Sequence, residues 1–475
     1  MASGLDRGKL AAVLAATVLG ALCWWFGSGL HPQWWLAWLA PLPVLWLAPR
    51  LRARWAALAA FAAYALGGCN QWVYLHGVVG LPLPFIMEAI AGPALVLMLA
   101  VLLHRRLLLR GRAVAAALAP AALWVAAEYA NGMLSPHGTF GSIAYSQMDA
   151  LPVIQVAAAT GLWGVSFLLL LLPAAMATLA WPQTPPRRGH AAVLAVALVP
   201  LAAALFYGWL RLQAPADSTL RIGLSSIEKP VRPELDGATG QALQARYVQA
   251  IDALAQQGAR VVVLPETSFA TADASVPAFA QLASQHGMVL DIGIDSRIDP
   301  RAEHNMAMAF TPGGASPLTY DKHHLIPGFE RQYTPGVDYT MLPSSPRIGL
   351  AICKDMDFHD TSLAYAARGA QLLLVPAWDF GVDGRLHSRM AIMRGVESGF
   401  AIARAARRGR LTLSDDRGRV LAEASSEQHD ASLVGDLPLR ATRTLYARWG
   451  DWFAWLDLAL LAILLAAALP SRRAD

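Results

Sequence analysis

Charged residues and cysteines are scarce in this 475-residue chain. Charged residues make up 15% of the sequence and hydrophobic residues 56%, whereas soluble domains average about 25% charged. Three cysteines, Cys23, Cys69 and Cys353, are too few for a disulfide framework, and no C-x-x-C or Cys/His cluster predicts zinc. The composition therefore excludes an entirely soluble protein, a disulfide-stapled protein and a structural zinc domain.

The net charge of +5 arises from basic residues in short clusters between apolar runs. This arrangement is typical of membrane proteins, because a nucleic-acid groove needs its basic residues on one continuous face. We therefore expect no nucleic-acid partner.

Long apolar runs indicate membrane-spanning helices, since about 20 apolar residues cross a hydrocarbon core of about 30 Å. The run nearest the N-terminus has no small-residue cleavage site after Phe26, so we interpret it as a retained anchor. The sequence predicts a seven-span domain over 1–212 and a C-terminal transmembrane helix over 446–470. The predicted spans are roughly 9–27, 34–49 (interrupted by Pro41 and Pro43), 54–76, 85–104, 113–130, 161–181, 190–211 and 449–469.

Basic residues predict the orientation of these spans, because short cytoplasmic loops accumulate Lys and Arg. The opposite loops, 77–84 and 131–160, contain almost no positive charge. We expect a cytoplasmic N-terminus and an external 218–440 region, as in a multi-pass inner-membrane protein of a bacterium with a periplasmic domain. The clustered basic residues are Arg7, Lys9, Arg50, Arg52, Arg54, Arg105, Arg106, Arg110, Arg112, Arg187, Arg188, Arg472 and Arg473.

Two acidic residues, Glu88 and Glu128, fall inside predicted spans. Carboxylates are costly in lipid, so each is a candidate functional residue. Each is equally well explained as a carboxyl group that faces the bundle interior or a helix end.

The region 218–440 alternates short β-rich runs with amphipathic helical runs, which predicts one α/β domain. Helices are expected over 239–257 and 387–398. Strands are expected over 220–225, 260–264, 288–294, 306–310, 348–352 and 372–375.

Three residues of this domain lie at or near strand ends, where α/β folds gather reactive groups. Glu266 follows one strand, Cys353 follows another, and Lys322 lies in the segment 320–327. A carboxylate can take a thiol proton, the thiolate can attack a carbonyl, and an ammonium can stabilise the resulting oxyanion. Alone, each also fits an ordinary role: a buried apolar thiol, a turn or a surface lysine.

The surrounding motifs resemble those of the nitrilase, or carbon-nitrogen hydrolase, superfamily. They are Leu264-Pro-Glu-Thr-Ser268, Lys322-x-His324-Leu-x-Pro327 and Gly349-Leu-Ala-Ile-Cys353-x-Asp355. The resemblance implies an α-β-β-α sandwich with a Glu-Lys-Cys triad. It implies that Glu266 is the general base, Lys322 the oxyanion group, Cys353 the nucleophile and Glu330 a supporting carboxylate.

The membrane spans narrow the resemblance to the apolipoprotein N-acyltransferase family. Supporting segments are Ala144-Tyr-Ser-Gln147, Gly161–Phe167 and His387–Gly399. This family resemblance implies a phospholipid acyl donor, a thioester on the cysteine, a diacylglyceryl lipoprotein acceptor, and no cofactor or metal. Two alternatives stay open: a membrane-tethered amidase or nitrilase, and a non-catalytic lipoprotein-binding paralogue.

Several segments depart from the family pattern. Gly328-Phe329 reverses a Phe-Gly pair, and Lys354-Asp355 replaces Tyr-Glu after the cysteine. The expected Gln-Gly-Asn is absent from 222–229, and a pair of asparagines is replaced around Arg407-Arg408. The departures concern the identity of the substrate more than the chemistry. The sequence does not predict the substrate-binding residues, the acyl chain, the head group, the acceptor or the oligomeric state.

Other polar groups have simpler interpretations. His323 and His324 suggest a metal site, but His324 is a motif position of the resemblance and no metal is expected. Four arginines in 404–410 are candidates for binding lipid head groups, although a solvated face is the commoner explanation. These arginines are Arg404, Arg407, Arg408 and Arg410.

Overall fold

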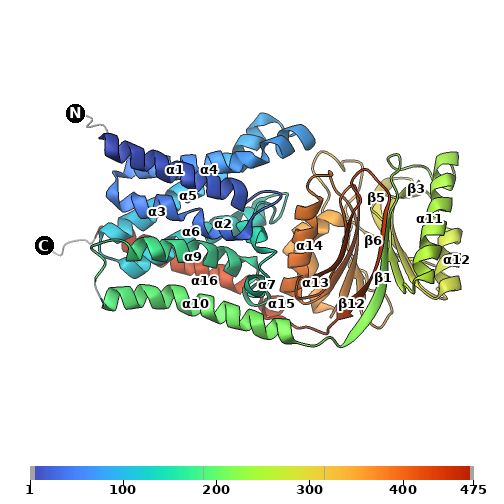
Figure 1. Ribbon diagram of the computed structural model, residues 1–475. Helices are drawn as coiled ribbons and strands as arrows, with labels where there is room; N and C mark the ends of the chain where they lie inside the picture. Colours follow the sequence, from blue (N-terminus) through green and yellow to red (C-terminus); the bar gives the residue numbers. More distant parts are fainter. Residues whose placement is uncertain (1–5, 186, 315, 471–475) are drawn as a thin grey trace. The chain divides into compact units, whose positions relative to one another are not determined.

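The computed structural model describes residues 6–185, 187–314 and 316–470 (Figure 1). The chain divides into two compact units. The first contains the chain up to 134, 141–212 and the chain from 451 onward, and the second contains 135–140 and 213–450. Arg472 and Arg473, two of the basic residues used to predict orientation, lie outside the described residues.

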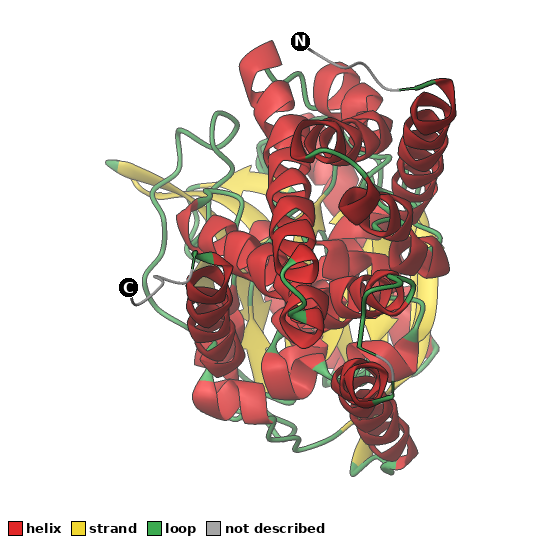
Figure 2. Cartoon of the chain, turned by 90° about the vertical axis from the view of Figure 1, so that its left-hand side faces the viewer, coloured by secondary structure: helices red, strands yellow, loops and turns green. Residues whose placement is uncertain are grey.

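The described part of the first unit is helical, with its helices side by side in a bundle (Figure 2). Five of its helices are long and apolar enough to cross a membrane: α1 (Arg7–Gly27), α5 (Leu83–Leu109), α6 (Ala113–Leu134), α9 (Leu162–Leu179) and α10 (Arg188–Gln213). The remaining elements are α2 (Trp34–Leu39), α3 (Leu42–Leu47), η1 (Ala48–Arg50), α4 (Ala53–Gly68), η2 (Cys69–Gln71), η3 (Val73–Val78), η4 (Ile143–Gln147), α7 (Leu151–Ile154), α8 (Ala157–Thr160) and α16 (Trp452–Ala468).

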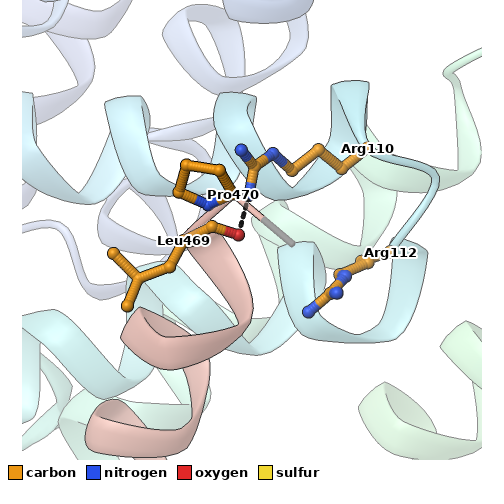
Figure 3. Close-up of a pocket in the computed structure, with 4 residues that line it drawn as sticks. All are labelled: Arg110, Arg112, Leu469 and Pro470. Carbon is orange, nitrogen blue, oxygen red and sulfur yellow. Dashed lines mark hydrogen bonds between the residues drawn. The ribbon is translucent and has the colours of Figure 1, made fainter. Parts of the chain in front are cut away.

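Polar side chains join these helices at their ends. The Arg110 guanidinium, at the end of α5, donates to the carbonyls of Ala468 and Leu469 at the end of α16. Figure 3 shows the bond to Leu469. The last carbonyls of a helix have no partner within the helix, so these bonds satisfy groups that would otherwise need water. The bonds hold the C-terminal helix against α5.

The two acidic residues predicted within spans have different environments. Glu128, on α6, accepts hydrogen bonds from the hydroxyls of Ser142 and Ser166 at 3.1 and 2.6 Å and from the Ile143 N–H at 2.9 Å. Its carboxyl group therefore faces the bundle interior and ties the 142–147 segment to α6 and α9. Glu88 is exposed on α5.

The second unit is a sandwich of two β-sheets. The first sheet has the order β12-β1-β2-β4-β5-β6, with β3 paired to β4, and the second has the order β11-β10-β9-β8-β7. The strands of the first sheet are β1 (Ser218–Ser226), β2 (Val261–Val263), β3 (Phe269–Thr271), β4 (Val289–Asp299), β5 (Ala302–Phe310), β6 (Leu318–Asp321) and β12 (Ala431–Leu439). Those of the second are β7 (Ile348–Leu350), β8 (Leu372–Trp378), β9 (Ala401–Arg407), β10 (Arg410–Ser414) and β11 (Val420–Ser425).

Helices cover the outer face of each sheet, which gives four layers (Figure 1). Helices α11 (Ala238–Gln256) and α12 (Pro277–His286) pack on the first sheet, and α13 (His359–Ala367) and α14 (Gly384–Ser398) pack on the second. Alternate strand residues such as Val263, Ala309, Leu350 and Leu374 fill the space between the sheets. This confirms the predicted α-β-β-α sandwich.

The six predicted strands are present as β1, β2, β4, β5, β7 and β8, and the two predicted helices as α11 and α14. The prediction missed β3, β6, β9, β10, β11 and β12, together with α12, α13 and the short α15 (Leu445–Trp449). The omission of β6 matters for the candidate site, because Lys322 directly follows it.

Candidate active site

Glu266, Lys322 and Cys353 follow β2, β6 and β7, so both sheets contribute to one site. The Lys322 ammonium lies 2.7 Å from Glu266 Oε1 and 3.0 and 2.9 Å from the two Glu330 oxygens. Lys322 is fully buried, and Glu266 and Glu330 are 3% and 6% exposed. The structure therefore places one buried cation between two carboxylates.

Asn305, on β5, completes this group and was missed by the sequence analysis. Its side-chain amide donates to Glu266 Oε1 and Glu330 Oε1, each at 2.6 Å. The Ile326 N–H donates to Glu330 Oε2 at 2.6 Å. The only available signal was an amide within a strand of mostly apolar residues.

A close approach between strands fixes the backbone at Glu266. A Cβ atom on Gly293 would lie 2.4 Å from the Glu266 Cα, so only glycine fits at that position of β4. Thr267, the residue after Glu266, has a positive φ of 44°, which is rare for a β-branched residue. The Glu266 N–H donates to the carbonyl of Ala377 at the end of β8.

Cys353 begins the short helix η5 (Cys353–Asp357), also with a positive φ, of 41°. Its thiol donates to the Trp378 carbonyl at 3.6 Å, and the residue is 9% exposed. Strained backbone of this kind is typical of functional sites.

Asp355 links the loop of Cys353 to the loop of Lys322. One of its oxygens accepts from the N–H groups of His323 and His324, at 3.1 and 2.9 Å. The other accepts from the Ile352 N–H at 3.0 Å and from the Tyr320 hydroxyl at 2.9 Å. This carboxylate therefore fixes the two loops relative to one another.

Burial and charge set the protonation of the site. Burial raises the pKa of the Cys353 thiol well above its usual range, and the Glu266 charge raises it further. Burial also raises the pKa of Glu266, although Lys322 opposes this effect. Burial disfavours the Lys322 ammonium, yet Glu266 and Glu330 outweigh it and hold the Lys322 pKa well above its usual value.

Lys354, which follows Cys353, is 6% exposed and lies 3.1 Å from His137 Nδ1. Burial lowers the pKa of Lys354, and burial with the Lys354 charge lowers that of His137 to about 4. His137 is therefore neutral and accepts the hydrogen bond.

The histidines suggested a metal site in the sequence. The His324 side chain lies 3.1 Å from an Asp360 carboxylate oxygen. Across the described ranges, no cluster of three or more His, Cys, Asp or Glu is arranged to hold a metal.

The interpretation of the four arginines as a solvated face is wrong for two of them. Arg404 and Arg407 are each 1% exposed, because β9 lies inside the second sheet. Arg404 forms a two-pronged ion pair with Asp379 at 2.9 and 2.5 Å. Arg408, in contrast, has a side chain that is 49% exposed.

Two family models match the chain. The model described as carbon-nitrogen hydrolase matches 239–446, and that described as apolipoprotein N-acyltransferase N-terminal domain matches 19–175. The second unit is therefore a carbon-nitrogen hydrolase domain of the nitrilase superfamily.

Known relatives resemble nearly the whole chain. The apolipoprotein N-acyltransferase of Geobacter metallireducens is 27% identical over 511 residues, covering 98% of this chain and 96% of the relative. That of Gloeobacter violaceus is 29% identical over 385 residues, covering 74% and 72%. A crystal structure of an amidase from Nesterenkonia sp. is 24% identical, with a TM-score of 0.41 over 51% of this chain and 95% of that one. The chain is thus similar to apolipoprotein N-acyltransferases over nearly its whole length.

The buried charges predict a strong effect of removing Lys322. Lys322→Met keeps an unbranched side chain, one atom shorter, but removes the charge and leaves two buried carboxylates facing each other, a loss of about 3–5 kcal/mol. For a domain of this size we expect the melting temperature of the full-length protein in detergent to fall by about 6 °C or more. Adding Glu330→Gln should restore part of the loss.

The control is Lys9→Met, which removes an exposed lysine from its ion pair with Asp6. It should leave the melting temperature almost unchanged, because exposed pairs contribute little. A Lys322→Met protein that melts like the unmodified one would show that the three charges do not form one buried group.

Proposed function

We propose that this protein is a membrane N-acyltransferase that moves an acyl chain from a phospholipid, through a thioester on Cys353, to the N-terminal amine of a lipoprotein. One observation carries the proposal. A single chain joins the N-terminal domain of apolipoprotein N-acyltransferases to a carbon-nitrogen hydrolase domain in which Lys322 contacts Glu266.

In the first step, Glu266 takes the proton of the Cys353 thiol, and the sulfur attacks the ester carbonyl. The Lys322 ammonium stabilises the oxyanion that forms. The carbon–oxygen ester bond then breaks, the departing oxygen takes the proton from Glu266, and a lysophospholipid leaves. A carboxylate with a raised pKa suits both roles, since it accepts the proton and then returns it.

In the second step, an amine attacks the thioester carbonyl and gives a proton to Glu266. The carbon–sulfur bond breaks, the thiol recovers this proton, and an amide is released. The covalent intermediate divides one difficult transfer into two easier ones. Glu330 and Asn305 would not react; their contacts hold Lys322 and the Glu266 carboxylate in place.

The choice between transfer and hydrolysis depends on what resolves the thioester. Cys353 is buried, and exclusion of water preserves a thioester until an amine arrives. The membrane helices favour a lipid donor, because they hold the domain at the bilayer where a lipid-anchored acceptor also lies. The alternative activity is a membrane-tethered amidase.

An acylation experiment separates the two activities. Purified protein given phospholipid alone should accumulate a hydroxylamine-sensitive acyl group on Cys353 and release about one equivalent of lysophospholipid. A diacylated lipopeptide with a free α-amine should then discharge the acyl group into a triacylated product, as followed by mass spectrometry.

Cys353→Ala should abolish acylation, whereas Cys23→Ala, in α1, should retain it. Blocking the α-amine of the lipopeptide should prevent discharge. Continuous release of fatty acid without an acceptor, or ready hydrolysis of small amides without acylation by phospholipid, would identify a hydrolase instead.

The pH dependence of acylation tests Glu266 as the base. Because burial raises the pKa of Glu266, the acid limb of the pH–rate profile of acylation should have its midpoint above the ordinary glutamate pKa of about 4.3. The rate falls as the pH drops through this limb, since protonated Glu266 cannot take the thiol proton.

Two variants should move the limb in opposite directions. The Asn305 amide favours ionised Glu266, so Asn305→Leu should move the limb to higher pH. The Glu330 charge disfavours it, so Glu330→Gln should move the limb to lower pH. Single-turnover acylation rates measured across pH give both shifts, and shifts of the same sign would exclude Glu266 as the titrating base.

We further propose that the protein is a multi-pass protein of the bacterial inner membrane, with membrane segments 1–212 and 446–470 and a periplasmic domain at 218–440. The basic loops support this orientation. Reporter fusions after Arg52, Arg106 and Arg188 should report the cytoplasm, and fusions after Ser218 and Arg440 the periplasm. A cytoplasmic report at Ser218 would remove the periplasmic lipoprotein as acceptor.

A further inference from the structure

Two segments that depart from the family pattern, around Lys229 and Arg407, lie next to one another. Arg407 Nη2 donates to the Lys229 carbonyl at 2.6 Å. Arg407 pairs with Trp378 across β9 and β8, and its guanidinium carbon lies 4.5 Å from the centre of the Trp378 ring. Segments nearly 180 residues apart in sequence thus form one local cluster.

This cluster adjoins the residues proposed to react. The Lys229 ammonium donates to the carbonyl of Thr267, the residue after Glu266, at 2.9 Å. The Trp378 carbonyl accepts the hydrogen bond of the Cys353 thiol. Lys229 therefore contacts the loop of Glu266, and Arg407 contacts the residue that binds Cys353.

The cluster contains buried donors without acceptors. Arg407 is 1% exposed, and its Nε and Nη1 have no hydrogen-bond partner among the residues that the structure describes. The same holds for the buried Thr267 hydroxyl within those residues. Unpaired charged donors are costly to bury, so their presence favours a ligand that supplies oxygen acceptors.

Positive charge in the cluster also exceeds negative charge. Burial and the neighbouring Arg407 charge lower the pKa of Lys229 to about 7. The facing Glu228 carboxylate is 3.7 Å from Arg407, has a side chain that is 32% exposed, and is shared with Arg408 at 3.4 Å. The Arg232 charge also lowers the pKa of Lys229, and the Asp295 charge raises it. An incoming anion would relieve the repulsion between the two buried cations.

We propose that Lys229, Thr267 and Arg407 form a subsite that binds an anionic oxygen group, a phosphodiester or a carboxylate, of the substrate that reacts at Cys353. This proposal rests on the proposed acyl transfer and adds the part of the substrate that is recognised. The planar arginine offers parallel N–H donors that suit phosphate and carboxylate oxygens, and the lysine adds a point charge.

The test compares donors that differ only in the anionic group. The rate of Cys353 acylation is measured with a phospholipid and with a diacylglycerol of the same acyl chains, which lacks the phosphate. The full-length protein should prefer the phospholipid by about ten-fold or more, as expected for a charge-assisted contact. Arg407→Gln and Lys229→Met should bring this ratio close to one.

Arg408→Gln is the matched control, because it removes the same charge from the adjacent residue and the same neighbour, Glu228. It should keep the unmodified preference. A thermal melt checks that each variant is folded. If a neutral variant does not fold, Arg407→Lys replaces it, because it keeps the charge but not the planar fork. An unchanged preference for phospholipid over diacylglycerol in Arg407→Lys would then overturn the role of Arg407.

The second half-reaction distinguishes the source of the anion. Protein already acylated on Cys353 is discharged with lipopeptides that end in a carboxylate or in an amide. A preference lost in the first half-reaction assigns the subsite to the donor phosphodiester, and one lost only in the second assigns it to an acceptor carboxylate. Arg407→Gln and Lys229→Met proteins that match Arg408→Gln in both half-reactions overturn the subsite.

A binding assay tests the subsite even if the protein does not transfer acyl chains. If phospholipid does not acylate the unmodified protein, alkylation of Cys353 by neutral iodoacetamide is measured with sn-glycerol 3-phosphate or with glycerol. Protection by the phosphate alone, at least about ten-fold weaker in Arg407→Gln than in Arg408→Gln, supports the subsite without the proposed function. Absence of protection in that case overturns the subsite as well.

Discussion

A buried ammonium between two carboxylates is the constraint on which the site depends. Lys322 is fully buried, and its charge is balanced only because Glu266 and Glu330 both lie within 3.0 Å of it. Burying any one of these charges alone would be strongly unfavourable. The ends of β2 and β6 and the loop that carries Glu330 must therefore meet in one geometry, and the amide of Asn305, reaching from β5, fixes it. The chemistry proposed for Glu266 depends on this arrangement, because the same contacts determine its protonation.

The end of β8 connects this charged group to the second sheet. Three successive residues contribute: the Ala377 carbonyl accepts the Glu266 N–H, the Trp378 carbonyl accepts the Cys353 thiol, and the Asp379 carboxylate pairs with Arg404. Asp355 makes a second connection, from the cysteine loop to the lysine loop. Cys353 and Glu266, the proposed nucleophile and base, follow strands of different sheets. Backbone and carboxylate contacts across the sandwich, and not a shared strand, therefore hold them in register.

The sequence suggested the candidate site residues because each lies in a short contiguous motif, and short β-rich runs predicted the strands that precede Glu266 and Cys353. Asn305 was not predictable in this way, since its partners are 39 and 25 residues away and meet it only when the sheet forms. The arginines of β9 were misinterpreted for the same reason. A run of alanines and arginines suggests a solvated segment, but Asp379, directly after the adjacent strand β8, neutralises Arg404. All residues of β9 are buried, and the strand lies between β8 and β10.

The positions of the divergent residues explain how such a protein can keep its chemistry while its substrate changes. The proposed reacting groups follow β2, β6 and β7, whereas Lys229 and Arg407 follow β1 and end β9. Lys229 contacts the first set through the Thr267 carbonyl, and Arg407 contacts it through the ring of Trp378. The ion pairs of Lys322 with Glu266 and Glu330, and the bond from the Cys353 thiol to the Trp378 carbonyl, involve neither Lys229 nor Arg407. Substitutions at Lys229 and Arg407 therefore change the charge presented to a substrate without removing these bonds. Recognition and bond formation are thus separable within the same sandwich.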